Sequence, residues 1–169
     1  IGEMYMNTYP NNGPTYVHPS ATLIRTIEMW GEGKWENFYT AFSGATNLTI
    51  PATDEPDLSL VTQMGDAFKN CTSLVGTTFN DWNVSTIQDM AFTFEGATSF
   101  NGNISSWITG ALTTMRHTFR GATAFNQNIG AWDTADVTSM QATFREATIF
   151  NQNISSWNTA NVTTMVQMF

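Results

Sequence analysis

Rows of amide side chains at a fixed spacing are the groups in this chain best suited to chemistry. Asparagine and glutamine recur with a period of about 25 residues, at eight positions: Asn101, Asn103, Asn126, Gln127, Asn128, Asn151, Gln152 and Asn153. Each amide offers hydrogen-bond donors and acceptors, so regular rows suit the hydroxyl groups of a glycan or the surface of another protein. The same amides can instead bond from one repeat to the next as a structural ladder. Both roles stay open, and the eight residues are the candidate ligand-binding side chains.

The other chemically capable groups do not form a catalytic or metal-binding set. Asp54, Glu55 and Asp57 cluster in one segment but lack the alternating oxygen-ligand spacing of a calcium-binding loop. The sequence contains no nucleophile elbow, no HExxH motif and no phosphate-binding loop. The one cysteine, Cys71, occupies a position that holds alanine in other repeats, which predicts a buried small side chain. His117 stands where other repeats have Phe or Ala, and we expect it at the surface. We therefore expect no enzyme, no metal and no cofactor.

A repeating unit of about 25 residues positions these side chains. Its clearest landmark is a methionine that recurs with the period of the unit: Met64, Met90, Met115, Met140 and Met165. Aromatic residues recur in step with it: Phe94, Phe119 and Phe144 in one column, and Trp82, Trp107, Trp132 and Trp157 in another. A fixed period of this length predicts an elongated stack of similar units. One unit has too little apolar surface to close a core, so we expect like rings to lie over one another in a shared interior.

Spacing within the unit predicts a helix and then a strand. Apolar residues at positions −3, 0, +4 and +7 relative to the methionine have the 3–4 step of a helical face, for example over 112–121. The residue at +6 can end such a helix in a left-handed cap. It is Gly44, Asn70, Gly96, Gly121 or Glu146. The Asn/Gln/Ser-rich piece, 101–107, has no helical period and predicts a loop that enters a short strand. The predicted fold class is an α/β repeat solenoid, a leucine-rich-repeat-like right-handed coil with one short strand and one short helix per repeating unit.

The chain divides into three parts on this pattern. Residues 1–20 show no period and are rich in Asn, Pro and Gly, which predicts a linker or irregular N-terminal segment. Residues 21–37 predict an N-terminal cap. Residues 38–169 predict a solenoid of five repeats and the start of a sixth, cut from a longer chain.

Composition limits the class of partner. Charged residues make up only 12% of the 169, and the net charge is −8, which argues against nucleic acid and against an anionic membrane surface. Every apolar run is far shorter than a membrane-spanning helix requires, so we expect no direct membrane insertion. The predicted surface is polar and mostly neutral.

Several phrases resemble a known group of proteins. They are IEMWGEGKWENFYTAFSGATNL, PDLSLVTQMGDAF, and the repeated AT-x-FN-x-NI-x-x-W with V-T-x-M. They resemble the bacterial surface-protein repeat family with units of about 25 residues, described as BspA-like leucine-rich repeats or lipoprotein-type repeats. The resemblance covers Leu23–Phe169. It implies a secreted or surface-anchored protein, often one module of a large adhesin-like polypeptide, and it brings no catalytic residues.

Repeat and resemblance together predict a non-catalytic extracellular module for adhesion or recognition in a larger bacterial surface protein. We expect it to bind a host or neighbouring-cell protein or glycan through the neutral polar face, and to contact further repeats of the same polypeptide. A purely structural stalk or spacer is the alternative. Nucleic acid is not expected among its partners.

Overall fold

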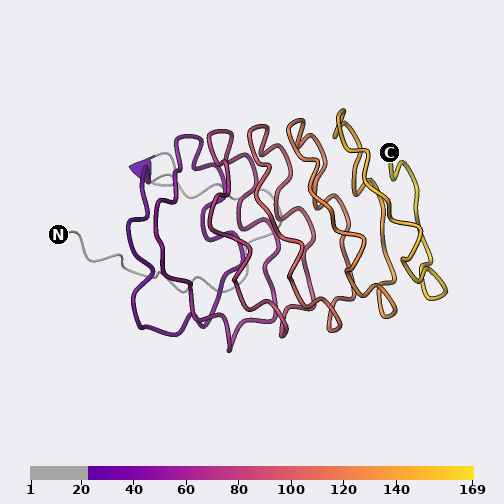
Figure 1. The fold of residues 1–169 in the computed structure, drawn as a ribbon, viewed down its shortest axis with the longest axis horizontal. Coiled ribbons are helices and arrows are strands. Elements are labelled where there is room, and N and C mark those ends of the chain that lie inside the picture. The colour runs from indigo at the N-terminus through magenta and orange to yellow at the C-terminus, as the bar shows by residue number, and fades with distance from the viewer. Residues whose placement is uncertain (1–22) are drawn as a thin grey trace.

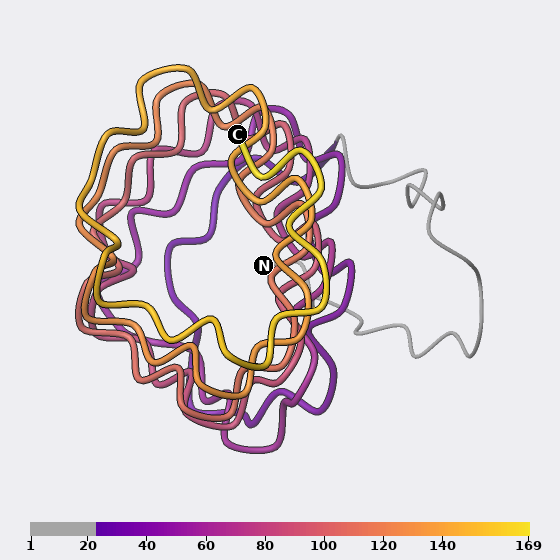
Figure 2. The ribbon, with the colours of Figure 1, turned by 90° about the vertical axis from the view of Figure 1, so that its right-hand side faces the viewer.

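The computed structural model describes residues 23–169. Over this range the chain winds into a stack of coils that follow one another from the first described residues to the C-terminus (Figure 1). Viewed along the stack, successive coils lie over one another around a common interior (Figure 2). Each repeat of the sequence is therefore one turn of a continuous coil.

Regular secondary structure is almost absent from residues 23–169. Within this range it consists of six isolated parallel β-bridges. Four bridges form one column that joins Gln63, Asp89, Thr114, Ser139 and Thr164. The other two join Thr26 to Thr49 and Lys34 to Asp57. Each member of the column directly precedes a residue of the methionine column, so the bridges keep the coils in register. No helix in this range is long and apolar enough to span a membrane.

The predicted α/β solenoid, with a helix and a strand in each repeat, is therefore wrong, and the leucine-rich-repeat, adhesion and lipoprotein classification taken with it is not supported. The helix predicted over 112–121 is absent, and residues 115–122 form a series of overlapping β-turns. The N–H groups of Thr118, Arg120 and Ala122 donate three residues back, at 3.0–3.2 Å. Those of Met115 and His117 donate instead to the next coil, at 3.1 and 2.8 Å. Half of the N–H groups thus join neighbouring coils, whereas a helix would use them internally.

Left-handed backbone is what prevents a helix. Two residues in each such segment have positive φ, for example His117 at 57° and Gly121 at 67°. An α-helix requires negative φ throughout, so the chain turns twice within the segment. The left-handed conformation predicted at +6 is confirmed for glycine, and also for Asn70 at 58° and Glu146 at 64°. It ends a turn instead of a helix. We call the segments 64–71, 90–97, 115–122 and 140–147 the turn ribbons.

Aromatic rings fill the interior of the stack. Phe119 is fully buried, and its ring lies 5.7 Å from Phe94 and 5.7 Å from Phe144, at interplanar angles of 5° and 3°. Trp107 and Trp132 are stacked 6.0 Å apart and are each 3% exposed. Like rings from successive coils therefore lie over one another.

Three tryptophans of the column, Trp107, Trp132 and Trp157, also tie their coil to the preceding one, whereas the indole N–H of Trp82 has no partner within residues 23–169. The indole N–H of Trp107 donates to the carbonyl of Phe79 at 2.7 Å, and that of Trp132 donates to Ile104 at 3.1 Å. Trp157 repeats the contact with Ile129, at 3.0 Å. The column thus supplies directional bonds as well as apolar area.

The N-terminal end of the stack is closed by two tryptophans. Trp30 and Trp35 are buried, with ring centroids 5.8 Å apart, and Trp35 packs on Phe38 at 4.9 Å. The predicted cap, 21–37, includes these residues, and its boundary stays a prediction. The predicted linker, 1–20, lies outside the described residues.

Candidate functional site

The first row of predicted site residues makes local turns. The side-chain oxygens of Asn103, Asn128 and Asn153 each accept the backbone N–H two residues later, at 3.0 Å. This is the Asx-turn, in which an asparagine stabilises the bend that follows it. All three side chains are exposed.

The second row joins one coil to the next. The side-chain oxygen of Asn101 accepts the backbone N–H of Asn126, and that of Asn126 accepts the N–H of Asn151, both at 2.9 Å. The amide of Gln127 donates to Asn101, and the amide of Gln152 donates to Asn126, both at 3.0 Å. The structure thus brings these five residues together as a ladder, in which the side-chain oxygens of Asn101 and Asn126 are occupied. Ligand binding by the eight amides stays a prediction.

Removing one rung of this ladder tests its structural role. Asn126→Ala deletes the acceptor of two hydrogen bonds and should lower the free energy of unfolding by about 1–2 kcal/mol. Asn151 is the matched control, because its side-chain oxygen accepts no bond within residues 23–169. Asn151→Ala should change stability by less than about 0.5 kcal/mol. Urea unfolding followed by tryptophan fluorescence measures both. Equal losses would show that the ladder adds nothing to stability.

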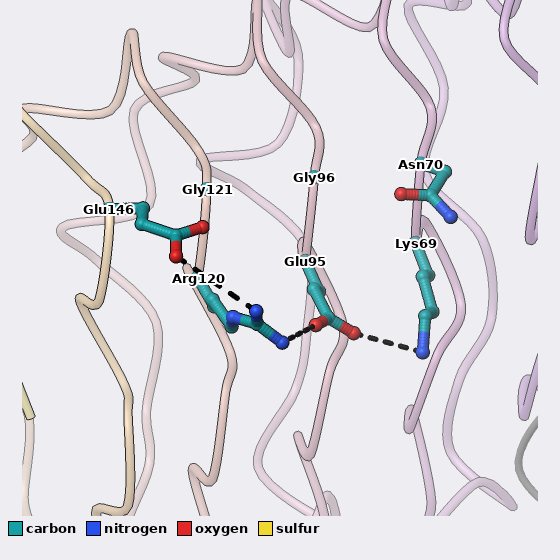
Figure 3. Close-up of a pocket in the computed structure, with 7 residues that line it drawn as sticks. All are labelled: Lys69, Asn70, Glu95, Gly96, Arg120, Gly121 and Glu146. Carbon is teal, nitrogen blue, oxygen red and sulfur yellow. Dashed lines mark hydrogen bonds and ion pairs between the residues drawn. The ribbon is translucent and has the colours of Figure 1, made fainter. Parts of the chain in front are cut away.

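A second candidate site crosses the turn ribbons. A shallow groove of about 250 Å³ is lined by Lys69, Asn70, Glu95, Gly96, Arg120, Gly121 and Glu146. Figure 3 shows that these residues come from four successive coils and that the charged side chains point toward one another across them. They occupy positions +5 and +6 of the unit. Gly96 and Gly121 contribute no side chains, and the amide oxygen of Asn70 occupies the space beside Gly96.

Glu95 is the centre of the charge network. One carboxylate oxygen lies 2.9 Å from Lys69 Nζ, and the other lies 3.0 Å from Arg120 Nη1. Lys69 also pairs with Asp66 at 3.1 Å. Burial raises the pKa of Asp66, an effect that Lys69 opposes. Burial acts to lower the pKa of Lys69, but its contacts with Glu95 and Asp66 outweigh this and the pKa is raised. The network therefore keeps Lys69 charged in a half-buried position.

The aromatic ring of Phe92 lies against two cationic side chains beside the groove. Lys69 Nζ lies 4.7 Å from the centre of the Phe92 ring, and Arg116 Cζ lies 4.6 Å from it. Both distances are in the range of cation–π attraction. The imidazole of His117 stacks on the same ring at 4.8 Å.

His117, predicted at the surface, is only partly exposed. Its side chain is 15% exposed, because the left-handed backbone at this position directs the ring onto Phe92 of the preceding coil. Burial lowers the pKa of His117, and Arg120 and Arg116 lower it further, against the opposing effect of Glu95 at 3.9 Å.

This lowered pKa predicts a pH-dependent stability. A histidine whose pKa falls on folding contributes fully above its unfolded value of about 6.5, and that contribution is lost as pH falls through the folded value. His117→Phe keeps a ring on Phe92 but removes the titration. The variant should lose less stability than the wild type between pH 7.5 and pH 5, measured by thermal unfolding. Parallel losses in the two proteins would contradict the assignment.

The remaining candidate groups have structural partners. Asp54 accepts the backbone N–H groups of Trp30 at 2.9 Å and Gly31 at 2.8 Å, and these bonds lower its pKa. The Cys71 thiol contacts the Phe42 carbonyl at 3.1 Å, and burial raises its pKa to about 12, so it is protonated at neutral pH. Within residues 23–169, no group of three or more His, Cys, Asp and Glu side chains is placed to hold a metal ion.

Comparison with known proteins identifies the family. The family described as "Mycoplasma protein of unknown function, DUF285" matches residues 36–130 and again residues 104–169. No curated protein and no solved structure matches the chain. The two family matches overlap and together reach from residue 36 to the C-terminus, which is consistent with a bacterial surface repeat protein. This chain belongs to the DUF285 family of Mycoplasma-type proteins.

Proposed function

We propose that this chain is a non-catalytic binding module of a larger bacterial surface protein, displayed outside the cell, that recognises another protein. The observation that carries the proposal is the groove across four turn ribbons, in which charged side chains of successive coils pair with one another. Repeat proteins commonly bind through surfaces built by equivalent positions of successive units. The likeness to surface repeats supports the extracellular location.

Positions of the unit differ in how much they vary from coil to coil. The buried position +4 is phenylalanine in every unit: Phe42, Phe68, Phe94, Phe119, Phe144 and Phe169. Position +5, beside the groove, is in turn Lys69, Glu95, Arg120 and Arg145. A uniform interior is sufficient to build the stack, so a varied outer position can serve recognition. Because the side-chain oxygens of Asn101 and Asn126 already accept hydrogen bonds within the amide ladder, the turn ribbons are the better binding surface.

Binding to protein and glycan arrays tests the proposal. The labelled full chain should bind a surface protein. Arg145→Ala alters the turn ribbons, and Gln152→Ala alters the amide face as the matched control. Loss of binding only in the first variant supports the proposal. Loss only in the second would move the site to the amides. No binding to either array at high micromolar concentration would contradict a binding function.

A structural spacer is the second candidate, and the amide ladder favours it. Amide oxygens that bond from coil to coil stabilise the stack without any ligand. A spacer predicts that exchanging the exposed residues of 101–106, 126–131 and 151–156 among repeats leaves the parent protein's function intact. Impaired function in a correctly folded exchange variant would argue against it.

A further inference from the structure

Arg120 uses only part of its guanidinium group. Nη1 binds Glu95 at 3.0 Å. Nε is buried and has no hydrogen-bond partner within residues 23–169, and Nη2 lies 4.0 Å from Glu146. Nε and Nη2 together form the edge of an arginine that matches the two oxygens of a carboxylate. This edge faces an acid that is too far away for a bidentate contact.

Glu146 is loosely held between two arginines. Its Oε1 lies 4.0 Å from Arg120 Nη2 and 3.4 Å from Arg145 Nε, whereas a charge-assisted bond measures about 2.7–2.9 Å. Its side chain is 56% exposed, more than that of Glu95 at 13%. An exposed pair at these distances contributes little, so the carboxylate can swing away at low cost. Figure 3 shows the Glu146 carboxylate next to the Arg120 guanidinium, joined to it by a dashed line.

We infer that Arg120, together with Arg145, is the recognition point of the groove for a carboxylate of an acidic peptide segment, and that Glu146 occupies this point until the peptide replaces it. The inference rests on the proposed function and adds the chemistry of the ligand. Displacement of Glu146 frees Nη2 of Arg120 for a ligand carboxylate, and the neighbouring Nε, which has no partner within residues 23–169, would complete a bidentate contact.

The shape of the groove favours a peptide. Its lining comes from four successive coils, from Lys69 to Glu146, so the groove runs along the stack. Coils about 5 Å apart make it roughly 15 Å long, the length of about five extended residues. A single acidic sugar would cover only part of this length. Near Gly121 only the backbone of Gly96 lies within 4 Å of where a side chain would begin, whereas at Gly96 that space is taken by Asn70 Oδ1.

Titration of the full chain with short probes tests the inference. The probes are acetyl-Glu-Gly-Glu-amide, its Gln-Gly-Gln counterpart and glucuronate, and the readout is the NMR signal of the Arg120 side-chain N–H. We expect the acidic peptide to shift this signal and the neutral peptide to leave it unchanged. Glu146→Gln should bind the acidic peptide about two- to fivefold more tightly, because it removes an internal competitor worth as much as an exposed ion pair. Asp136→Asn, which makes the same charge change in an exposed loop, should show a smaller gain.

Two arginine variants keep the test decisive. Arg120→Lys retains the charge but loses the planar guanidinium group. Its affinity for the acidic peptide should fall to the affinity of the wild type for the neutral peptide. Arg145→Gln alters a more exposed side chain and should weaken binding while thermal unfolding is unchanged. Wild-type affinity in both variants, equal gains in Glu146→Gln and Asp136→Asn, or preference for glucuronate would each overturn the inference. If the probes fail while array binding still depends on the turn ribbons, the inference falls and the proposed function stands.

Discussion

Replacing Phe119 with alanine is expected to lower the free energy of unfolding by about 3–5 kcal/mol. The ring is fully buried and stacks on Phe94 and Phe144 of the neighbouring coils at 5.7 Å. It also lies 4.0 Å from Phe125 of its own coil. Because a repeat protein is stabilised by the interfaces between adjacent units, loss of this ring weakens two interfaces at once. Urea unfolding, followed by circular dichroism and tryptophan fluorescence, measures the change.

Phe169 provides the matched control in the same column. Its ring contacts Phe144 at 5.7 Å, but 71% of the side chain is exposed. Phe169→Ala should therefore cost less than about 1 kcal/mol, close to the effect of a surface substitution. If the two substitutions cost the same, stacking in the middle of the coils does not hold the protein together.

The stacking of coils could be predicted from the sequence because it follows from the regular spacing of equivalent residues in successive repeats. Phe119 and Trp132 recur with the period of the repeat, and any fold that repeats in step brings such residues over one another. The local backbone could not be predicted in the same way. A helix places apolar residues at a 3–4 spacing on one face. Overlapping turns with left-handed residues place them on one face as well, so the spacing does not distinguish the two structures.

The residues that decide between helix and turns carry weak signals. Glycine at 121 suggests left-handed backbone, but His117 at φ 57° and Ala142 at φ 50° do not. An alanine with left-handed backbone is unusual, and the residues next to it in the sequence do not predict this conformation. The surrounding bonds between coils impose it, for example from the N–H of Ala142 to the carbonyl of Val166 at 2.9 Å.

The two candidate sites differ in the same respect. The amide rows were visible because like residues repeat, at Asn101, Asn126 and Asn151. The charged groove was missed because unlike residues meet there: Glu95 pairs with Arg120 of the following repeat. Writing the repeats beneath one another places opposite charges in neighbouring rows of position +5. That comparison is the signal that could have found the site.

The second large effect is expected at Gly102. A methyl group at this position would overlap the carbonyl oxygen of Gly76 and lie 3.0 Å from its Cα, so the obstacle is backbone. Neither atom can move as the end of a flexible side chain would, and the two coils must separate locally. Gly102→Ala should therefore destabilise the fold by about 1–3 kcal/mol, the usual cost of overpacking.

Gly110 separates this close approach from the general effect of replacing a glycine. A Cβ there would lie 3.6 Å from Asp133 Oδ2, an ordinary contact. Because alanine narrows the unfolded ensemble, Gly110→Ala should be neutral or should stabilise by up to about 1 kcal/mol. Thermal and urea unfolding of the two variants give opposite signs if the coils touch at Gly76 and Gly102. If both substitutions changed the free energy of unfolding in the same direction, the backbones at Gly76 and Gly102 would not be in close contact.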